Sequence, residues 1–188
     1  MKIGLTVVVA AFSASLAHTK EPKFQLTICT DAEAVASFGA AVRFRAIVSQ
    51  IYSKIGVGVS WHRGLDGCAP EAILVSVSDR TPPTLLPRAL AYALPYEGAH
   101  IQVFYDRIRQ SCAAPLRGYL LGHVVAHEIA HLLQGLVRHS DCGLMKPPWD
   151  ANDFAQMSFR PLQFTPRDIE LIHKGLRARM VAAQPEPD

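Results

Sequence analysis

Apolar and polar residues follow one another in a pattern that predicts a strand, a long helix and a second strand near the start of the chain. Residues 24–29 and 57–61 are rich in strand formers. Between them, apolar residues recur at helical spacing up to about residue 55, and Thr30 or Asp31 can cap the helix. Such a unit forms a right-handed crossover, so the two strands are expected to be parallel.

Shorter elements are predicted in the middle of the chain. Residues 72–77 and 99–105 favour a third and a fourth strand, the fourth at an edge of the sheet. Residues 85–95 indicate a loop or an irregular strand, and residues 106–110 a short helical turn. The element order is therefore that of an α/β fold.

A strongly apolar helix is predicted after Pro115, and Gly135 ends it. The sequence of residues 150–163 predicts irregular structure. The run from Thr165 to Asp168, with proline in the first turn, starts a last helix, and residues 182–188 form a polar tail.

Composition limits the class of protein. The chain has 188 residues, of which 49% are hydrophobic and 19% charged, as in a single globular domain and unlike a disordered chain. The net charge is +3, and Lys and Arg are scattered, so no nucleic-acid partner is expected. We expect a monomer.

The N-terminal residues have the features of a signal peptide. Lys2 precedes an apolar run over residues 3–12, and Ser15 and Ala17 are small residues where a signal peptidase acts. We predict a signal peptide at residues 1–17, cleavage after Ala17, and a secreted or periplasmic protein. An uncleaved anchor is the alternative; no later stretch is long and apolar enough to insert stably in a membrane.

The cysteines of an exported protein are expected to form disulfides, because the compartments outside the cytosol are oxidising. The chain has four cysteines: Cys29, Cys68, Cys112 and Cys142. Three pairings are possible. Cys29 and the loop that carries Cys68 leave the sheet at the same end if their strands are neighbours. We therefore prefer Cys29–Cys68, which leaves Cys112–Cys142 as the second pair. Zinc binding by cysteines is less expected because no C-x-x-C pair occurs.

The apolar helix carries an H-E-x-x-H motif formed by His127, Glu128 and His131. Histidines four residues apart lie on one face of a helix and can bind one Zn²⁺ ion. Glu128 is then placed to act as general base toward a water on the metal. His139 is the expected third ligand, and Asp141 is the alternative.

Two other interpretations of the histidines on this helix exist. His123 shares the helix face of His127, but a packed or surface histidine is the better prediction. The motif could also lie on an ordinary helix face, which would bury two imidazoles and a carboxylate with no metal to compensate them.

The motif and the residues after it resemble the metzincin clan of zinc peptidases. The resemblance lies in the run from His127 to His131, a later glycine, His139-Ser140, and Gly143-Leu144-Met145 followed by Pro147. The run HSDCGLMKP looks most like the matrixin version. The overall pattern is most similar to uncharacterised exported bacterial proteins that share these motifs.

The resemblance implies a zincin-like domain over residues 18–188. Its upper part, residues 18–135, would hold a mixed sheet, a long backing helix and the active-site helix. Its lower part, residues 136–181, would be small and irregular and end in a helix. Met145 would form a turn beneath zinc bound by His127, His131 and His139.

The chain departs from the clan pattern in two places. Gln134 stands where metzincins have glycine, and His139 follows His131 by eight residues rather than six. In addition, no tyrosine follows Met145 to stabilise an oxyanion.

The function expected from these features is that of an exported zinc endopeptidase. An edge strand near His100–Phe104 would pair with an extended peptide substrate. The alternatives are a non-catalytic peptide-binding protein of the same fold and a zinc hydrolase with a non-peptide substrate.

Overall fold

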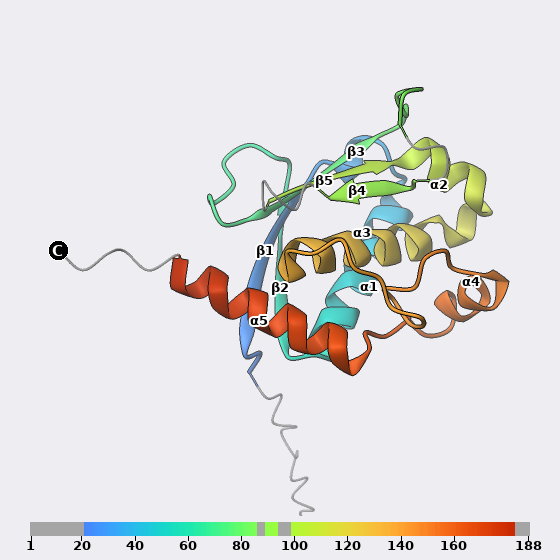
Figure 1. The fold of residues 1–188 in the computed structure, drawn as a ribbon. Helices are drawn as coiled ribbons and strands as arrows, with labels where there is room; N and C mark the ends of the chain where they lie inside the picture. The colour runs from blue at the N-terminus through green and yellow to red at the C-terminus, as the bar shows by residue number, and fades with distance from the viewer. Residues whose placement is uncertain (1–20, 86–88, 94–98, 183–188) are drawn as a thin grey trace, which may run out of the picture.

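A five-stranded mixed sheet organises the residues that the computed structural model describes, namely 21–85, 89–93 and 99–182 (Figure 1). The strand order is β2-β1-β3-β5-β4. All neighbours are parallel except β4 and β5, which are antiparallel. The strands are β1 (Phe24–Thr30), β2 (Val57–Arg63), β3 (Ile73–Ser78), β4 (Ala91–Ala93) and β5 (His100–Phe104). The predicted α/β class and the parallel pairing of the first two strands are thus confirmed.

The edge of the sheet differs from the prediction. Residues 100–104 were expected there, but β5 lies between β3 and β4. The short strand β4 pairs with β5 through Ala91–Val103 and Ala93–Ile101, so β4 occupies the edge. Three residues are too few to show an alternating pattern, which is why the sequence indicated only a loop or irregular strand here.

The long helix α1 (Phe38–Ser53) begins later than predicted. Thr30 accepts a hydrogen bond from the backbone of Ala32, and the Asp31 carboxylate accepts one from the Val77 backbone at 2.8 Å. Both side chains thus tie the end of β1 to its surroundings instead of capping the helix. A 3₁₀ turn, η1 (Ala32–Ala34), follows, and Ser37 is the N-cap of α1.

The remaining helices follow β5 in the chain. They are α2 (Tyr105–Ser111), the 3₁₀ turn η2 (Ala114–Leu116), α3 (Arg117–Gln134), α4 (Ala151–Met157) and α5 (Pro166–Ala182). The prediction that residues 150–163 are irregular was wrong, because they contain α4. Asp150 and Asp153 form a capping box at its start, and only Met157 of this helix is buried, so no apolar pattern marks it.

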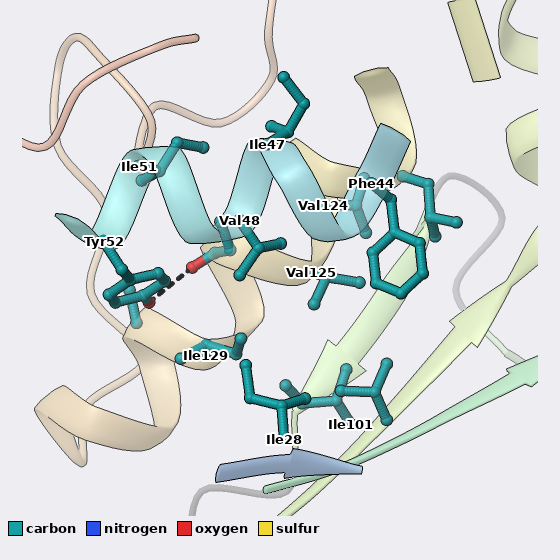
Figure 2. Close-up of a cluster of buried hydrophobic side chains, with 14 of the residues drawn as sticks. Ile28, Phe44, Ile47, Val48, Ile51, Tyr52, Ile101, Val124, Val125 and Ile129 are labelled. Atoms are coloured by element: carbon teal, nitrogen blue, oxygen red, sulfur yellow. Dashed lines mark hydrogen bonds between the residues drawn. The ribbon is translucent and has the colours of Figure 1, made fainter. Parts of the chain in front are cut away.

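One face of the sheet is covered by α1 and α3, and the core lies between these helices and the strands (Figure 2). Along β1, Phe24, Leu26 and Ile28 are buried while Gln25 is exposed, as expected for a strand with one face covered. Ile28 belongs to the same core cluster as Val125 and Ile129 of α3 (Figure 2). Each such side chain stabilises the fold by about 1.5–3 kcal/mol on burial.

Helix α3 approaches α1 closely because its facing residues are small. A Cβ on Gly122 would lie 2.7 Å from Cβ of Ile47 and 3.1 Å from the Phe44 carbonyl oxygen. One turn further on, the Tyr52 hydroxyl donates a hydrogen bond of 3.0 Å to the carbonyl of Ala126 (Figure 2). This contact fixes the helix that carries the histidine motif.

The cysteines confirm one predicted pair and contradict the other. Cys29 and Cys68 form a disulfide. Cys112 and Cys142 are free thiols: Cys112 donates a weak hydrogen bond to Ile108 of the preceding helix, and Cys142 is exposed. The second pairing was inferred by elimination, which assumes that every cysteine is paired, and that assumption fails here.

The predicted signal peptide, residues 1–17, lies outside the described residues, as do residues 183–188 of the predicted tail. Within the described ranges, no helix is both long and apolar enough to cross a membrane.

Candidate metal centre

Helix α3 places His127 and His131 one turn apart on the same face, as the motif predicts. Both side chains are buried, and their ring centroids are 4.7 Å apart. Because the helix is anchored to α1 and to the sheet, the positions of these two imidazoles are set by the core.

The third histidine reaches the other two in spite of its unusual spacing. Helix α3 continues through Gln134, and Gly135 ends it in the left-handed conformation with φ of 63°. The chain then turns back, and the ring centroid of His139 lies 5.3 Å from that of His127 and 4.9 Å from that of His131. The possible ligand atoms of these three histidines all lie within 4.8 Å of one another. Asp141, the alternative ligand, is exposed and is not among them.

Hydrogen bonds orient the two helical imidazoles. Nδ1 of His127 lies 2.9 Å from the Leu144 carbonyl oxygen, and Nδ1 of His131 lies 3.1 Å from the Leu136 carbonyl oxygen. A carbonyl can only accept, so each Nδ1 carries the proton and each Nε2 presents a lone pair. Metal-binding histidines have this arrangement.

The two lone pairs face each other, since the Nε2 atoms of His127 and His131 are only 3.0 Å apart. Burial lowers the pKa of His127 to about 4 and also lowers that of His131, so both rings are neutral near pH 7. No proton is then left to lie between the two nitrogens. A cation removes the repulsion, and tetrahedral zinc at about 2.0–2.1 Å from each nitrogen would set them about 3.3 Å apart. The residues present therefore fit a zinc ion.

Glu128 lies beside this cluster in a largely desolvated position. Burial raises the pKa of its carboxyl to about 7, although a hydrogen bond from the backbone of Ala93 in β4 acts in the opposite direction. A carboxyl group with a pKa near neutrality can both accept and return a proton. The contact with Ala93 also ties the edge strand to the motif helix.

A tight turn at Gly143, Leu144 and Met145 lies under the histidines. Met145 is fully buried, and its carbonyl accepts a hydrogen bond of 2.9 Å from the Ser140 backbone, which closes the turn. Gly143 has φ of 75°, and a side chain there would collide with the Gln163 carbonyl. Glycine is therefore required at this position.

Trp149 supports the histidines from the side. Its indole N–H donates to the Leu144 carbonyl, the same oxygen that accepts from His127, and its ring meets that of His127 edge-on at 5.7 Å. His123 is buried, bonded to the Tyr119 carbonyl and to the Leu162 backbone N–H. It is a packed histidine, as predicted, with both ring nitrogens engaged.

A cavity of about 780 Å³ opens beside Glu128. Leu90, Val124, Trp149 and Phe154 contribute apolar walls. A larger cavity of about 930 Å³ lies between α5 and the end of α3, and none of the three clustered histidines lines it. The first cavity is therefore the one that can hold a molecule next to the candidate metal centre.

Several parts of the site were missed at the sequence level. The carbonyls of Leu136 and Leu144 and the amide of Ala93 are backbone groups, which leave no signal in a sequence. Trp149 belongs to no motif, so the sequence gives no sign of its contact with His127. Asp168, which contacts the residues on either side of His139, was expected only as part of a helix start.

Comparison with known proteins identifies the fold. No protein-family model matches the chain, and no curated protein matches it either. The structure is similar to archaemetzincin from Methanopyrus kandleri, with a TM-score of 0.54 and 16% identity over 85% of this chain and 99% of that one. It is also similar to a zinc-dependent peptidase from Methanocorpusculum labreanum, with a TM-score of 0.56 and 14% identity over 78% and 99%. These likenesses confirm the predicted zincin-like α/β fold.

Proposed function

We propose that the protein is an exported zinc-dependent endopeptidase of the metzincin type. The observation that carries the proposal is the convergence of three imidazoles on one point, with the buried carboxyl of Glu128 and an open cavity beside them. The two structural neighbours described as archaemetzincin and as a zinc-dependent peptidase support the same class.

His127, His131 and His139 would hold the zinc ion. Three protein ligands are typical of catalytic zinc and leave a position open, whereas structural zinc is closed by a fourth ligand. When bound, the ion supplies a Lewis acid that polarises the scissile carbonyl and acidifies water.

Glu128 would act as the general base and then as the general acid. It takes a proton from the attacking water and delivers it to the nitrogen of the leaving amine. Its buried position next to His127 favours this role, because a carboxyl with a pKa of about 7 is a stronger base than an exposed one and still releases its proton readily.

The substrate would be an extended peptide that lies along β4. The sequence suggested residues 100–104 for this contact, but β5 lies inside the sheet, and β4 is the edge strand on this side and lies next to Glu128. An apolar substrate side chain would fill the cavity formed by Leu90, Val124 and Trp149.

Two further observations support the finer details. The buried Met145 and its closed turn suit a methionine turn of the matrixin kind, which the run HSDCGLMKP resembles. The disulfide between Cys29 and Cys68 suits an oxidising compartment, in agreement with the predicted signal peptide.

The test is digestion of a mixed peptide library by the zinc-loaded protein, with and without a chelator, and by the variant Glu128→Gln. We expect cleavage by the parent only, and a loss of about 10²–10⁴-fold in kcat/KM for the variant at unchanged zinc content. Equal cleavage by parent and variant would contradict the mechanism. Zinc binding without any cleavage would favour a peptide-binding protein or a hydrolase with another substrate.

A further inference from the structure

A buried carboxylate links the loop that carries His139 to the last helix. Asp168, near the start of α5, is fully buried. Its two oxygens have different partners. Oδ2 accepts hydrogen bonds from the backbone and the hydroxyl of Thr165, at 3.0 and 2.7 Å, and so caps α5.

The other oxygen binds the loop that carries His139. Oδ1 accepts a hydrogen bond of 2.7 Å from the Arg138 guanidinium and one of 2.8 Å from the Ser140 hydroxyl. These two residues flank His139 on both sides. Burial alone would raise the pKa of Asp168, but the hydrogen bonds from Thr165, Ser140 and Arg138 hold it below its usual value. The group is therefore an anion at neutral pH.

His139 needs such support more than the other two histidines do. His127 and His131 belong to a packed helix, and each is bonded at Nδ1 to a carbonyl. The His139 side chain is exposed, and among the described residues its ring has no comparable hydrogen bond. Its position depends on the backbone to either side of it.

We propose that Asp168 is the positioning residue for the third metal ligand: by binding Arg138 and Ser140 it holds His139 in place to complete the zinc site. The inference rests on the proposed function for the identity of the ion. It assigns to one side chain two separable tasks, the capping of α5 through Oδ2 and the fixing of the ligand loop through Oδ1.

Two variants interrupt the loop contacts. Asp168→Asn keeps the volume but has one carbonyl oxygen in place of two carboxylate oxygens. The double variant Arg138→Gln/Ser140→Ala removes the partners of Oδ1 and leaves the cap of α5 in place. We expect both to bind Zn²⁺ about 10–100-fold more weakly than the parent, the range typical for partners of metal ligands. With saturating Co²⁺, their visible absorption bands should shift toward those of His139→Ala.

Thr165→Val is the matched control, because it removes the hydroxyl from the cap and leaves the contacts with Arg138 and Ser140 intact. It should lower the midpoint of thermal unfolding while Zn²⁺ affinity, measured by competition with a chelating dye, stays at the parent value. A loss of affinity in Thr165→Val equal to that of the double variant would overturn the proposal, since helix stability would then explain both.

His139→Ala separates failure of this proposal from failure of the metal centre itself. If His139→Ala binds zinc weakly but the Asp168 and double variants bind like the parent, the positioning role is refuted and the three-histidine site stands. If His139→Ala binds as tightly as the parent, His139 is not a ligand, and both the proposed site and the role of Asp168 fail.

Discussion

At the scale of a single residue, burial of the Glu128 carboxyl lowers the free energy of unfolding at neutral pH. Its carboxyl is largely removed from water, and its pKa is raised from 4.5 to about 7 by burial. Below pH 4.5 the group is protonated in both the folded and the unfolded chain. Between pH 4.5 and about 7 the carboxyl is ionised in the unfolded chain but still protonated in the folded one, so the zinc-free protein loses stability as pH rises through this window.

This cost can be measured with Glu128→Gln, which keeps the shape and lacks the charge. We expect the zinc-free variant to be more stable than the zinc-free parent at pH 8, by up to about 3 kcal/mol for a pKa shift of this size. The difference should shrink as pH falls through 7 and vanish near pH 4.5. Urea unfolding with a chelator present measures it, and a difference that does not change with pH would show that ionisation of Glu128 is not its cause.

At the scale of elements, the contact between α1 and α3 fixes the metal centre. Gly122 allows the two helices to approach until the Phe44 carbonyl and Ile47 would touch an added Cβ. Gly39, near the start of α1, has open space around its own Cβ position. The two glycines therefore form a natural pair for comparison.

We expect Gly122→Ala to destabilise the protein by about 1–3 kcal/mol, because an added methyl group must push the helices apart. Gly39→Ala should be neutral or slightly stabilising, since alanine favours the helix and meets no neighbour. Thermal unfolding of the two variants side by side is the measurement. Destabilisation by Gly39→Ala as large as that by Gly122→Ala would show that loss of glycine, rather than close packing, is responsible.

The elements also show which parts of the structure the sequence could predict. The alternation in β1 and the apolar run of α3 were recognised because many side chains face one core. Helix α4 has one buried residue, and β4 has three residues in all, so neither has a periodic pattern. Capping was harder to predict. Thr30 binds the backbone of Ala32 in the turn before the helix, and Asp31 binds the backbone of Val77, which is distant in sequence.

Some residues of the candidate site could also be predicted from the sequence, and others could not. His127, Glu128 and His131 follow from helix geometry alone. His139 was proposed from the resemblance in spite of its spacing, and the structure brings its ring close to the other two. Asp168 contacts residues about 30 positions away, and the carbonyls that orient the imidazoles belong to the backbone. Contacts of these kinds depend on the tertiary fold, which no local pattern contains.

On the scale of the whole molecule, the cysteines provide a direct check of the fold. Four cysteines with one disulfide leave two thiols, and of these Cys142 is exposed while Cys112 is half-buried. Burial also raises the pKa of Cys112, which makes it the less reactive of the two.

We therefore expect a thiol reagent to label two cysteines in the denatured, unreduced protein, and Cys142 first in the native protein. Peptide mapping by mass spectrometry identifies the labelled positions, and Cys142→Ser should remove the fast phase. Complete absence of labelling would mean that Cys112 and Cys142 are paired, as the sequence suggested.

The exposed loop after α3 affects how readily other peptidases can degrade the protein. Leu136 and Val137 are 47% and 72% exposed, next to a histidine that only neighbouring residues and a bound ion would hold. Exposed apolar side chains on a surface loop are accessible to the active sites of other peptidases. If His139 binds zinc as proposed, loss of the ion removes one of the contacts that hold this loop, so we expect other peptidases to cleave the zinc-free protein here faster than the zinc-loaded one.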